Sequence, residues 1–489
     1  MPPLFDLICL SRRERDLLHR IRVILGTKED RFLVGGIIRD AFLRRRREKI
    51  DFDLVSPCSK EDVSLLQSQL GGKIVLLDER LGIYRLVLTP YVYIDVAKLR
   101  EGGIEEDLRH RDFTVNAVAI RLSDLKIVDP LKGLRDLKIG KLRLCGPDVM
   151  LEDALRVLRA FSISAQCGLA WTREVGRAIG KCKGGLEEIA KERVNQELLR
   201  LFSSYRCADW VKRMFKSGVF PILVPEMKDM EGIWQGPYHH LDVLEHSFLA
   251  LQRLEDLLSR IPKITRITHR DFLLSYLNER IGNWPRRALL KWAALFHDIG
   301  KPFVKEVKED GRVTFYRHDL VGAKILSSRM QKLKFSRRQV DFVKTLLQLH
   351  MRPGDLTREG TTLRAVYRFF RQSEGEDLAV MLLSWADAWA TRGRLNPWRN
   401  FYSHRKRLIE MINLSVEEKT KADLPRLLSG HDVMKILSIP PGPVVGKALD
   451  IVREKQFLGE IQSREEAENW LKKWWRRRKK YLTVSTNEC

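Results

Sequence analysis

Two carboxylates lie two positions apart in the sequence IDFDLVSP, as Asp51 and Asp53. Side chains two apart on a strand share one face, so both could hold one or two Mg²⁺ ions, which prefer oxygen ligands and phosphate partners. A later alternating apolar run, YVYIDVAKLR, carries Asp95, which could supply a third carboxylate near this pair. The simpler alternatives are a strand with two solvent-facing acids and an acid on an edge strand.

A pair of glycines, Gly35 and Gly36, precedes these acids in RFLVGGIIRDAF. Glycine allows a tight turn and a close backbone approach to a ligand. Phe32–Val34 predicts a short buried strand and Ile37–Leu43 a helix, whose N-terminus could seat a phosphate. Ile50–Val55, where apolar residues alternate with acids, predicts a second strand. A phosphate seat beside a metal-binding acid pair indicates metal-assisted phosphoryl or nucleotidyl transfer.

The segment DLRHRDFTVNAVAI combines charged residues with an apolar stretch that predicts a strand over Thr114–Ile120. Arg109, Arg111 and Asp112 precede this strand, and Asn116 lies within it. The planar fork of arginine suits phosphate or ribose oxygens. Asn116 could contact a ribose hydroxyl or a triphosphate.

The segment LEDALRVLRA has the spacing of a helix with polar residues on it, namely Glu152, Asp153, Arg156 and Arg159. Asp153 and Arg156 are three apart and would share a helix face. They could form an ordinary ion pair near a helix start. They could instead present acceptors and donors to the edge of a base.

These segments, in order, resemble successive motifs of the class II tRNA nucleotidyltransferases. That family belongs to the polymerase β-type superfamily and includes CCA-adding enzymes and bacterial poly(A) polymerases. The matching motifs are GGIIRD, DFD, RDFTVNA and EDALRVLRA, followed by KERVNQELLRLF. Together they cover roughly residues 30 to 200 and are more specific than any one of them.

The resemblance implies a role for each matching residue. The catalytic carboxylates would be Asp51, Asp53 and Asp95, with Mg²⁺ bound by the first two. The nucleotide-binding residues would be Gly35, Gly36, Arg39, Arg109, His110, Arg111, Asp112, Asn116, Asp153, Arg156 and Arg159. Of these, Asp153 and Arg156 would pair with the Watson–Crick edge of CTP or ATP. His110 is a departure, because the family commonly has arginine there and histidine offers less charge and fewer donors to a ribose.

A second constellation lies between residues 238 and 390. Its members are His246, His297, Asp298, His318, His350 and Asp387, with Gly300-Lys301 following the His-Asp pair. This order resembles the HD superfamily of metal-dependent phosphohydrolases, and such side chains could coordinate one or two divalent metals. A helical scaffold with satisfied histidines is the alternative. His431-Asp432, a second His-Asp pair, is expected to start a helix rather than bind metal.

The resemblances together imply template-independent addition of C and A nucleotides to tRNA 3′ ends, using CTP and ATP. The HD domain, with a divalent metal of unknown identity, would hydrolyse 3′-end or 2′,3′-cyclic phosphates. Enzymes that add only CC or only A, and poly(A) polymerases, share these motifs and stay open as alternatives. So does an enzyme whose principal activity is the HD phosphohydrolase.

The whole chain, of 489 residues, has a formal net charge of +25 and is 44% hydrophobic. The charge indicates a polyanionic partner, first of all nucleic acid. No apolar run approaches the ~20 residues of a membrane span, and seven scattered cysteines without metal spacing fit reduced thiols, so we expect a cytoplasmic protein without a membrane partner. Its oligomeric state is not predicted.

The predicted fold class is α+β. Short strand patterns, at Lys73–Leu77, Tyr84–Leu88 and Tyr91–Val96, alternate with helical patterns in the first part, and helices dominate thereafter. We expect a polymerase-β-type head of mixed sheet plus helices, followed by a mostly helical body that includes an all-α HD domain. The predicted domains are the head at 1–146, a helical neck with the base-recognition motif at 147–232, the HD domain at 233–396, and a C-terminal RNA-binding region with a basic tail at 397–489.

Overall fold

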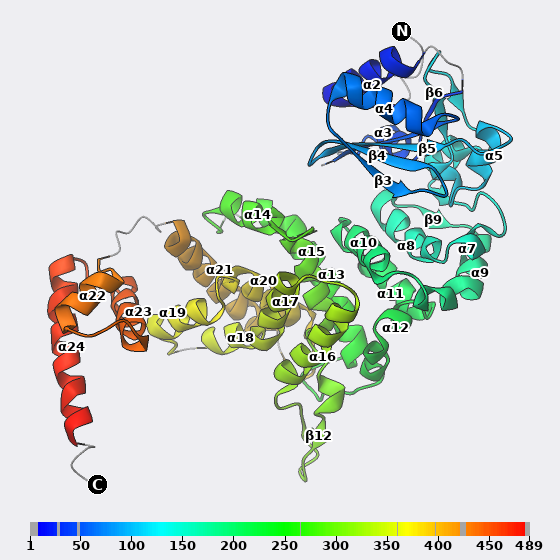
Figure 1. The fold of residues 1–489 in the computed structure, drawn as a ribbon. Coiled ribbons are helices and arrows are strands. Elements are labelled where there is room, and N and C mark those ends of the chain that lie inside the picture. The colour runs from blue at the N-terminus through cyan, green and yellow to red at the C-terminus, as the bar shows by residue number, and fades with distance from the viewer. Residues whose placement is uncertain are drawn as a thin grey trace. The chain divides into compact units, whose positions relative to one another are not determined.

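The computed structural model describes residues 8–26, 30–45, 49–264, 266–358, 360–396, 398–420 and 427–484, with side chains as far as residue 477. The chain divides into two compact units, Met1–Pro225 and Glu226–Cys489. Figure 1 shows the first in blue to green and the second in green to red. The finer division into four domains stays a prediction, and its boundary at residue 397 falls outside the described residues. Among the helices of the described part, none is long and apolar enough to cross a bilayer.

Unit 1 is built on a mixed seven-stranded sheet in the order β3-β4-β5-β2-β1-β6-β7. The strands are β1 (Phe32–Val34), β2 (Ile50–Ser56), β3 (Lys73–Asp78), β4 (Ile83–Thr89), β5 (Val92–Lys98), β6 (Ala119–Arg121) and β7 (Ile127–Val128). β2 and β5 run parallel, and the other neighbours are antiparallel. The predicted mixed-sheet head is therefore confirmed.

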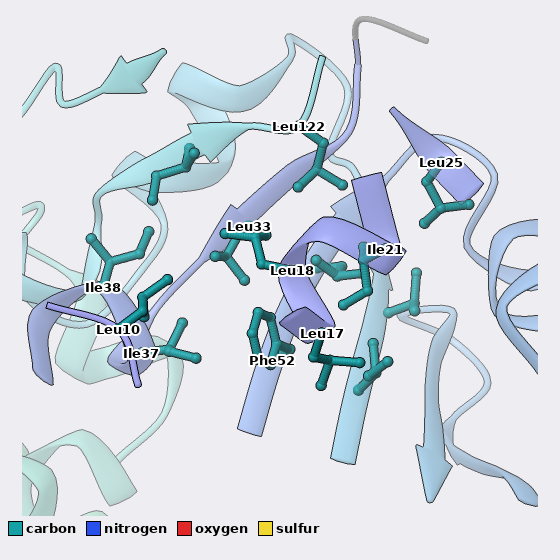
Figure 2. Packing of buried hydrophobic residues seen from close by; sticks show 14 of the residues in the cluster. Leu10, Leu17, Leu18, Ile21, Leu25, Leu33, Ile37, Ile38, Phe52 and Leu122 are labelled. Atoms are coloured by element: carbon teal, nitrogen blue, oxygen red, sulfur yellow. The ribbon is translucent and has the colours of Figure 1, made fainter. Parts of the chain in front are cut away.

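The two faces of β2 have opposite characters because successive side chains alternate. Phe52 and Leu54 are buried in an apolar core with Leu33 of β1. Helices α2 (Arg12–Leu25) and α4 (Ser59–Leu70) complete that core, and Figure 2 shows α2 side chains gathered near Leu33 and Phe52. Burial of each large side chain contributes about 1.5–3 kcal/mol. The same alternation places both aspartates on the opposite face.

The strand predicted over Thr114–Ile120 is wrong in its first half. Thr114–Asn116 forms a 3-10 turn, and β6 begins only at Ala119. The side chain of Asn116 donates to the Asp112 carboxylate and accepts from Arg39, and the Asn116 backbone N–H donates to the carbonyl of Phe113. Such local polar bonds compete with an extended strand.

The helices that follow the sheet in unit 1 are α6 (Gly133–Lys138), α7 (Val149–Glu152), α8 (Leu155–Cys167), α9 (Arg173–Cys182), α10 (Lys191–Ser203), α11 (Ala208–Lys216) and α12 (Phe220–Leu223). The continuous helix expected from Glu152 to Arg159 is wrong, because Asp153 is extended, with φ −150° and ψ 105°, and separates α7 from α8. Its side chain accepts from the Leu155 N–H at 3.0 Å, near the start of α8. Between sheet strands, α3 (Gly36–Phe42) follows β1, and α5 (Ile104–Arg109) follows β5.

Unit 2 is mostly helical, as predicted. Its central helices are α13 (Val243–Arg260), α15 (Arg286–Phe296), α16 (His318–Lys332), α17 (Arg337–Leu349), α20 (Asp377–Ala390) and α21 (Trp398–Thr420). α13 packs against α15 and α20, α16 against α17, and α20 against α21. α15 is buried from Ala288 to Phe296, so the residues that follow it emerge inside the unit.

A small cluster of three helices ends unit 2: α22 (Gly430–Leu437), α23 (Pro443–Phe457) and α24 (Arg464–Val484). Ser429 and Asp432 form a capping box at the start of α22. The second His-Asp pair therefore starts a helix, as expected. Trp470, Trp474 and Trp475 are half-buried against the core of this cluster, and the basic tail beyond Arg477 lies outside the described side chains.

Candidate functional site

Three carboxylates converge on the polar face of the unit 1 sheet. Asp51 and Asp53 lie on β2, and Asp95 lies on the parallel strand β5, where it pairs with Asp53 in register. One oxygen from each lies within 4.8 Å of the others. Arg85 of β4 holds both oxygens of Asp95 at 2.7 Å, so it fixes the orientation of that carboxylate.

Burial and mutual repulsion raise the pKa values of two of these acids, Asp51 and Asp53. Burial and the charge of Asp51 raise the pKa of Asp53 to about 7. Burial and the charge of Asp95 raise the pKa of Asp51. A divalent cation would relieve this repulsion, and an all-oxygen donor set suits Mg²⁺. The residues present therefore fit a magnesium site.

The glycine turn lies directly against this cluster. Gly35 has φ +83°, and a Cβ placed on it would be 2.7 Å from Oδ2 of Asp53. A side chain at this position would therefore displace the carboxylate. Gly36 begins α3. Both glycines line the cavity into which the carboxylates open.

The carboxylates open into a cavity of about 670 Å³, a size that suits a nucleotide. Elements β2, β4, β5, α3, α8 and α10 contribute to its walls. All the predicted catalytic and nucleotide-binding residues line it except Arg109. Arg109 is 56% exposed and pairs with Glu105 at 3.8 Å and Glu106 at 3.7 Å on its own helix, so the structure does not bring it to the site.

A chain of buried polar contacts forms one wall of the cavity. Arg39 donates to Oδ1 of Asn116 at 2.6 Å, Asn116 donates to Asp112 at 3.0 Å, and Arg159 donates to Asp112 at 2.7 Å. Burial opposes the charge of Asp112, but Arg159 and the Asn116 hydrogen bond outweigh it and lower the pKa of Asp112. Arg39 and Arg159 are thus positioned at two ends of one network.

His110 is held between two glutamates. Its ring nitrogens lie 3.0 Å from Glu106 and 3.3 Å from Glu152. Arg111, next along the chain, is bound through Asp107 at 3.1 Å and lines the cavity. Histidine therefore occupies this cavity wall with acidic partners on both sides.

The expected ion pair between Asp153 and Arg156 is absent from the described residues. Asp153 instead binds Arg193 of α10 at 2.6 Å. Arg156 binds Glu152 at 3.1 Å and donates to the backbone carbonyls of Val149 and His110. Both side chains still line the cavity, each oriented by a different neighbour.

Sequence reasoning missed several basic residues of this cavity, among them Lys49, Arg85, Arg100, Arg193 and Arg200. The sequence did contain a pattern that could have identified Arg193 and Arg200. They lie seven apart on α10, which is two helical turns and therefore one face.

A second constellation of six side chains gathers inside unit 2. His246, His297 and Asp387 form one group, and Asp298, His318 and His350 form another, each with ligand atoms within 4.8 Å. Asp298 lies between the groups. Its Oδ2 is 3.2 Å from His297, and its Oδ1 is 3.4 Å from His318. One or two divalent metal ions would be held by these six side chains.

Backbone carbonyls orient three of these imidazoles. Nδ1 of His297 donates to Ala294, Nδ1 of His318 to Phe315, and Nδ1 of His350 to Leu347, at 2.7–2.9 Å. Each Nε2 therefore lies within the ligand cluster, where it could bind metal, and the bonds at Nδ1 resemble the outer-shell hydrogen bonds of metal sites. Burial opposes charge on His297, but Asp298 raises the pKa of His297 to about 10. A metal would replace that proton, so the donor set fits a divalent cation.

Four of the six HD ligands, Asp298, His318, His350 and Asp387, line a cavity of about 700 Å³. Lys301, which donates to Oδ2 of Asp298 and to Gln235 at 2.6 Å each, lies at its wall. His239 and His404 also line it, and neither was singled out from the sequence. The Nδ1 atom of His239 and the Nε2 atom of His404 are buried without a hydrogen-bond partner in the described part of the chain.

Comparisons with known proteins agree with this geometry. Residues 31–143 match the Poly A polymerase head domain, residues 168–231 the "Probable RNA and SrmB- binding site of polymerase A", and residues 243–392 the HD domain. An A-adding tRNA nucleotidyltransferase of Deinococcus radiodurans is 33% identical, over 90% of this chain and 95% of its own. The chain belongs to the tRNA nucleotidyltransferase family.

A second relative supports this membership, and a solved structure shares the fold. A CC-adding tRNA nucleotidyltransferase of Thermus thermophilus is also 33% identical, over 92% of this chain and 94% of its own. The Thermotoga maritima CCA-adding enzyme, solved with tRNA, has the same fold, with a TM-score of 0.60 at 18% identity over 96% of each chain. This tRNA nucleotidyltransferase is thus an enzyme, as its sequence motifs predicted.

Proposed function

We propose that unit 1 of this tRNA nucleotidyltransferase adds C and A nucleotides to tRNA 3′ ends without a nucleic-acid template, using CTP, ATP and Mg²⁺. The carboxylate cluster of Asp51, Asp53 and Asp95, open to an arginine-rich cavity, carries this proposal. Solved CCA-adding enzymes of the same fold were determined with CTP and with ATP.

Different residues of the cavity would have different roles in the in-line transfer of the nucleotide. Asp51 and Asp53 would hold Mg²⁺, which supplies charge neutralisation at the triphosphate when bound. Arg39 and the backbone of Gly35 and Gly36 would bind the triphosphate. Attack of the tRNA 3′-OH on the α-phosphorus breaks the bond to the β-phosphate and releases pyrophosphate.

Base selection would come from the protein itself. The Asp153 carboxylate offers acceptors and the Arg156 guanidinium offers donors, and both line the cavity. Their partners, Arg193 and Glu152, lie on other elements and would fix their positions. These two side chains could therefore replace a template base.

Incorporation assays decide how much of the CCA end is made. tRNA transcripts that end before CCA or after CC would be incubated with Mg²⁺ and labelled CTP, ATP or both. Full CCA addition gives two C and one A. Because the relatives of this chain include an A-adding and a CC-adding enzyme, addition of CC alone or A alone is the second candidate, and long A tails would indicate a poly(A) polymerase.

The metal assignment has its own test. The double variant Asp51→Asn with Asp53→Asn should lose incorporation, because the ligands lose their charge. The double variant His297→Ala with Asp298→Ala leaves these residues intact and serves as control. Incorporation that survives the first variant would overturn the assignment.

We further propose that unit 2 hydrolyses phosphate esters at RNA 3′ ends, including 2′,3′-cyclic phosphates. The buried set of six ligands, with three imidazoles oriented by backbone carbonyls, supports this second activity. Water that cleaves the P–O3′ bond of a cyclic phosphate leaves a 2′-phosphate and a free 3′-OH, and hydrolysis of a 3′-phosphate releases inorganic phosphate and leaves the same 3′-OH, which unit 1 needs. The His297→Ala with Asp298→Ala variant should neither open a 2′,3′-cyclic end to a phosphomonoester nor release phosphate from a 3′-phosphorylated end, while the Asp51→Asn with Asp53→Asn variant should still do both.

A further inference from the structure

A row of aromatic side chains runs along the surface beside the HD cavity. Trp389 of α20 stacks on Phe401 of α21 at 6.1 Å, and Trp398 stacks on Tyr402 at 6.0 Å and 24°. Phe401 contacts Trp398 edge-on at 6.0 Å, which joins the two pairs. Trp398 is 52% exposed and Tyr402 57% exposed. Two flat rings are thus open to solvent on one helix.

Basic side chains lie over these rings. Arg253 and Arg260 lie 5.0 and 5.1 Å from the centre of Trp389. Arg392 lies over Trp398 and, at 5.4 Å, over Phe401. Its Nη2 atom is buried and has no hydrogen-bond partner among the described residues.

A pocket of about 610 Å³ continues the row at Tyr402. Its charged lining is entirely basic within the described part of the chain, with Lys263, Arg266, Arg405 and Lys406. None of these four forms an ion pair with a described residue. Uncompensated cations beside exposed aromatic rings favour an anion that also has planar groups to stack.

The same helix connects this surface to the HD centre. Asn400, Phe401 and His404 of α21 line the HD cavity together with Asp298 and Asp387. Phe401 therefore belongs both to the aromatic row and to the wall of the metal-binding cavity. α21 packs on α20, which carries Asp387. The aromatic row and the HD centre therefore belong to one packed unit.

We propose that this aromatic and basic surface of α21 binds a single-stranded RNA 3′ end and delivers its terminal phosphate to the HD centre. The inference rests on the proposed phosphohydrolase activity and names its substrate-binding track. Bases would stack on Trp398 and Tyr402, and the backbone phosphates would contact Lys263, Arg266, Arg405 and Lys406. Base stacking needs no particular sequence, so the track would accept many RNA ends.

The test compares two substrates on the full-length enzyme: a short single-stranded oligoribonucleotide with a 2′,3′-cyclic phosphate, and the small ester bis(4-nitrophenyl) phosphate. Trp398→Ala with Tyr402→Ala should lower the preference in kcat/KM for the RNA over the small ester by about 5- to 150-fold. Lys263→Ala with Arg266→Ala should reduce the salt slope of RNA KM by about 0.7 for each phosphate that these side chains no longer neutralise. The controls are Tyr91→Ala, 61% exposed on unit 1, and Arg337→Ala, whose side chain is 96% exposed. Both should leave the preference unchanged.

Crosslinking gives a second result that does not depend on hydrolysis. A 4-thiouridine oligoribonucleotide irradiated with the full chain should attach to peptides that contain Trp398 or Tyr402. An unchanged preference together with attachment only elsewhere would overturn the inference. Competition by polyglutamate but not by RNA would instead assign the surface to an acidic protein. If the enzyme cleaves neither substrate, the phosphohydrolase proposal fails, and crosslinking alone then decides whether RNA binds here.

Discussion

At the scale of single residues, the unit 1 site depends on the absence of a side chain as much as on the carboxylates. The positive φ of Gly35 and the 2.7 Å approach of Asp53 exclude a Cβ at this position. Positive φ is costly for other residues, while a clash with a metal ligand is a separate effect on activity. The backbone strain and the clash with Asp53 can be separated, because another glycine of the head has a positive φ but no atom near its Cβ position.

Gly35→Ala is expected to lower the free energy of unfolding by about 1–2 kcal/mol and nucleotide incorporation by about a hundredfold. Gly71→Ala is the matched control, because Gly71 has φ +74° and nothing within 4 Å of its Cβ position. It should lose similar stability and keep incorporation. Chemical denaturation and incorporation rates measure both. Equal loss of incorporation in the two variants would show that the Asp53 contact is unimportant.

Magnesium binding at Asp53 should depend on pH around neutrality. Burial and Asp51 raise the pKa of Asp53 to about 7, so the carboxyl keeps its proton at lower pH and the metal must displace it. The apparent Mg²⁺ affinity should fall about tenfold for each pH unit below 7 and level off above it. The Mg²⁺ concentration that gives half-maximal incorporation, measured at several pH values below and above 7, is a measure of this affinity. A flat profile would contradict the shifted pKa.

At the scale of elements, the break between α7 and α8 positions the residues that we propose for base recognition. Asp153 is extended there and binds Arg193 of α10 at 2.6 Å, so α10 orients a residue of another segment. Arg193 is thus a positioning residue in our proposal. Its effect should pass through Asp153 rather than through the nucleotide directly.

Asp153→Asn and Arg193→Ala should each change the discrimination between CTP and ATP by about tenfold, and the double variant should do little more. The reason is that both remove the same ion pair. Ratios of kcat/KM for the two nucleotides measure this coupling. Arg177→Ala, an exposed change on α9, should have no effect. Additive effects would mean that Arg193 acts independently of Asp153.

At the scale of the whole molecule, the two centres lie in separate compact units. Each could therefore respond to its own metal. In unit 2 the six ligands are brought together by residues of α13, α16 and α20 and by the segments that follow α15 and α17. Metal bound there would stabilise the packing of these elements.

Removal of divalent metal with EDTA should lower the melting temperature of unit 2 in calorimetry. A ligand present at a hundred times its Kd contributes about 2.7 kcal/mol, because it binds only the folded state. The His297→Ala with Asp298→Ala variant should lose this response to EDTA. A transition of unit 2 that EDTA leaves unmoved would argue against a metal-dependent HD centre.

The sequence by itself determined the parts of this protein that depend on local patterns. Alternation placed Phe52 and Leu54 in the core and both aspartates on the other face of β2, and the ordered His and Asp residues indicated the HD centre. The family and its mixed-sheet head were predicted from the resemblance of several ordered motifs to those of known enzymes. These features are local because strand alternation and turn chemistry act over a few residues.

Only the tertiary structure decided contacts between distant segments. The turn at Asn116 depends on Arg39, and the position of Asp153 depends on Arg193 of α10. Arg109 was predicted to bind the nucleotide because it lies just before the motif at Arg111, yet it pairs with Glu105 and Glu106 outside the cavity. The aromatic row was not predicted either: Trp398, Phe401 and Tyr402 share the spacing of one helix face on α21, but Trp389 of α20 joins them only after packing. Hydrogen bonds and ring stacking between residues far apart in the sequence override local conformational preference, and they cannot be predicted from the periodicity of hydrophobic residues.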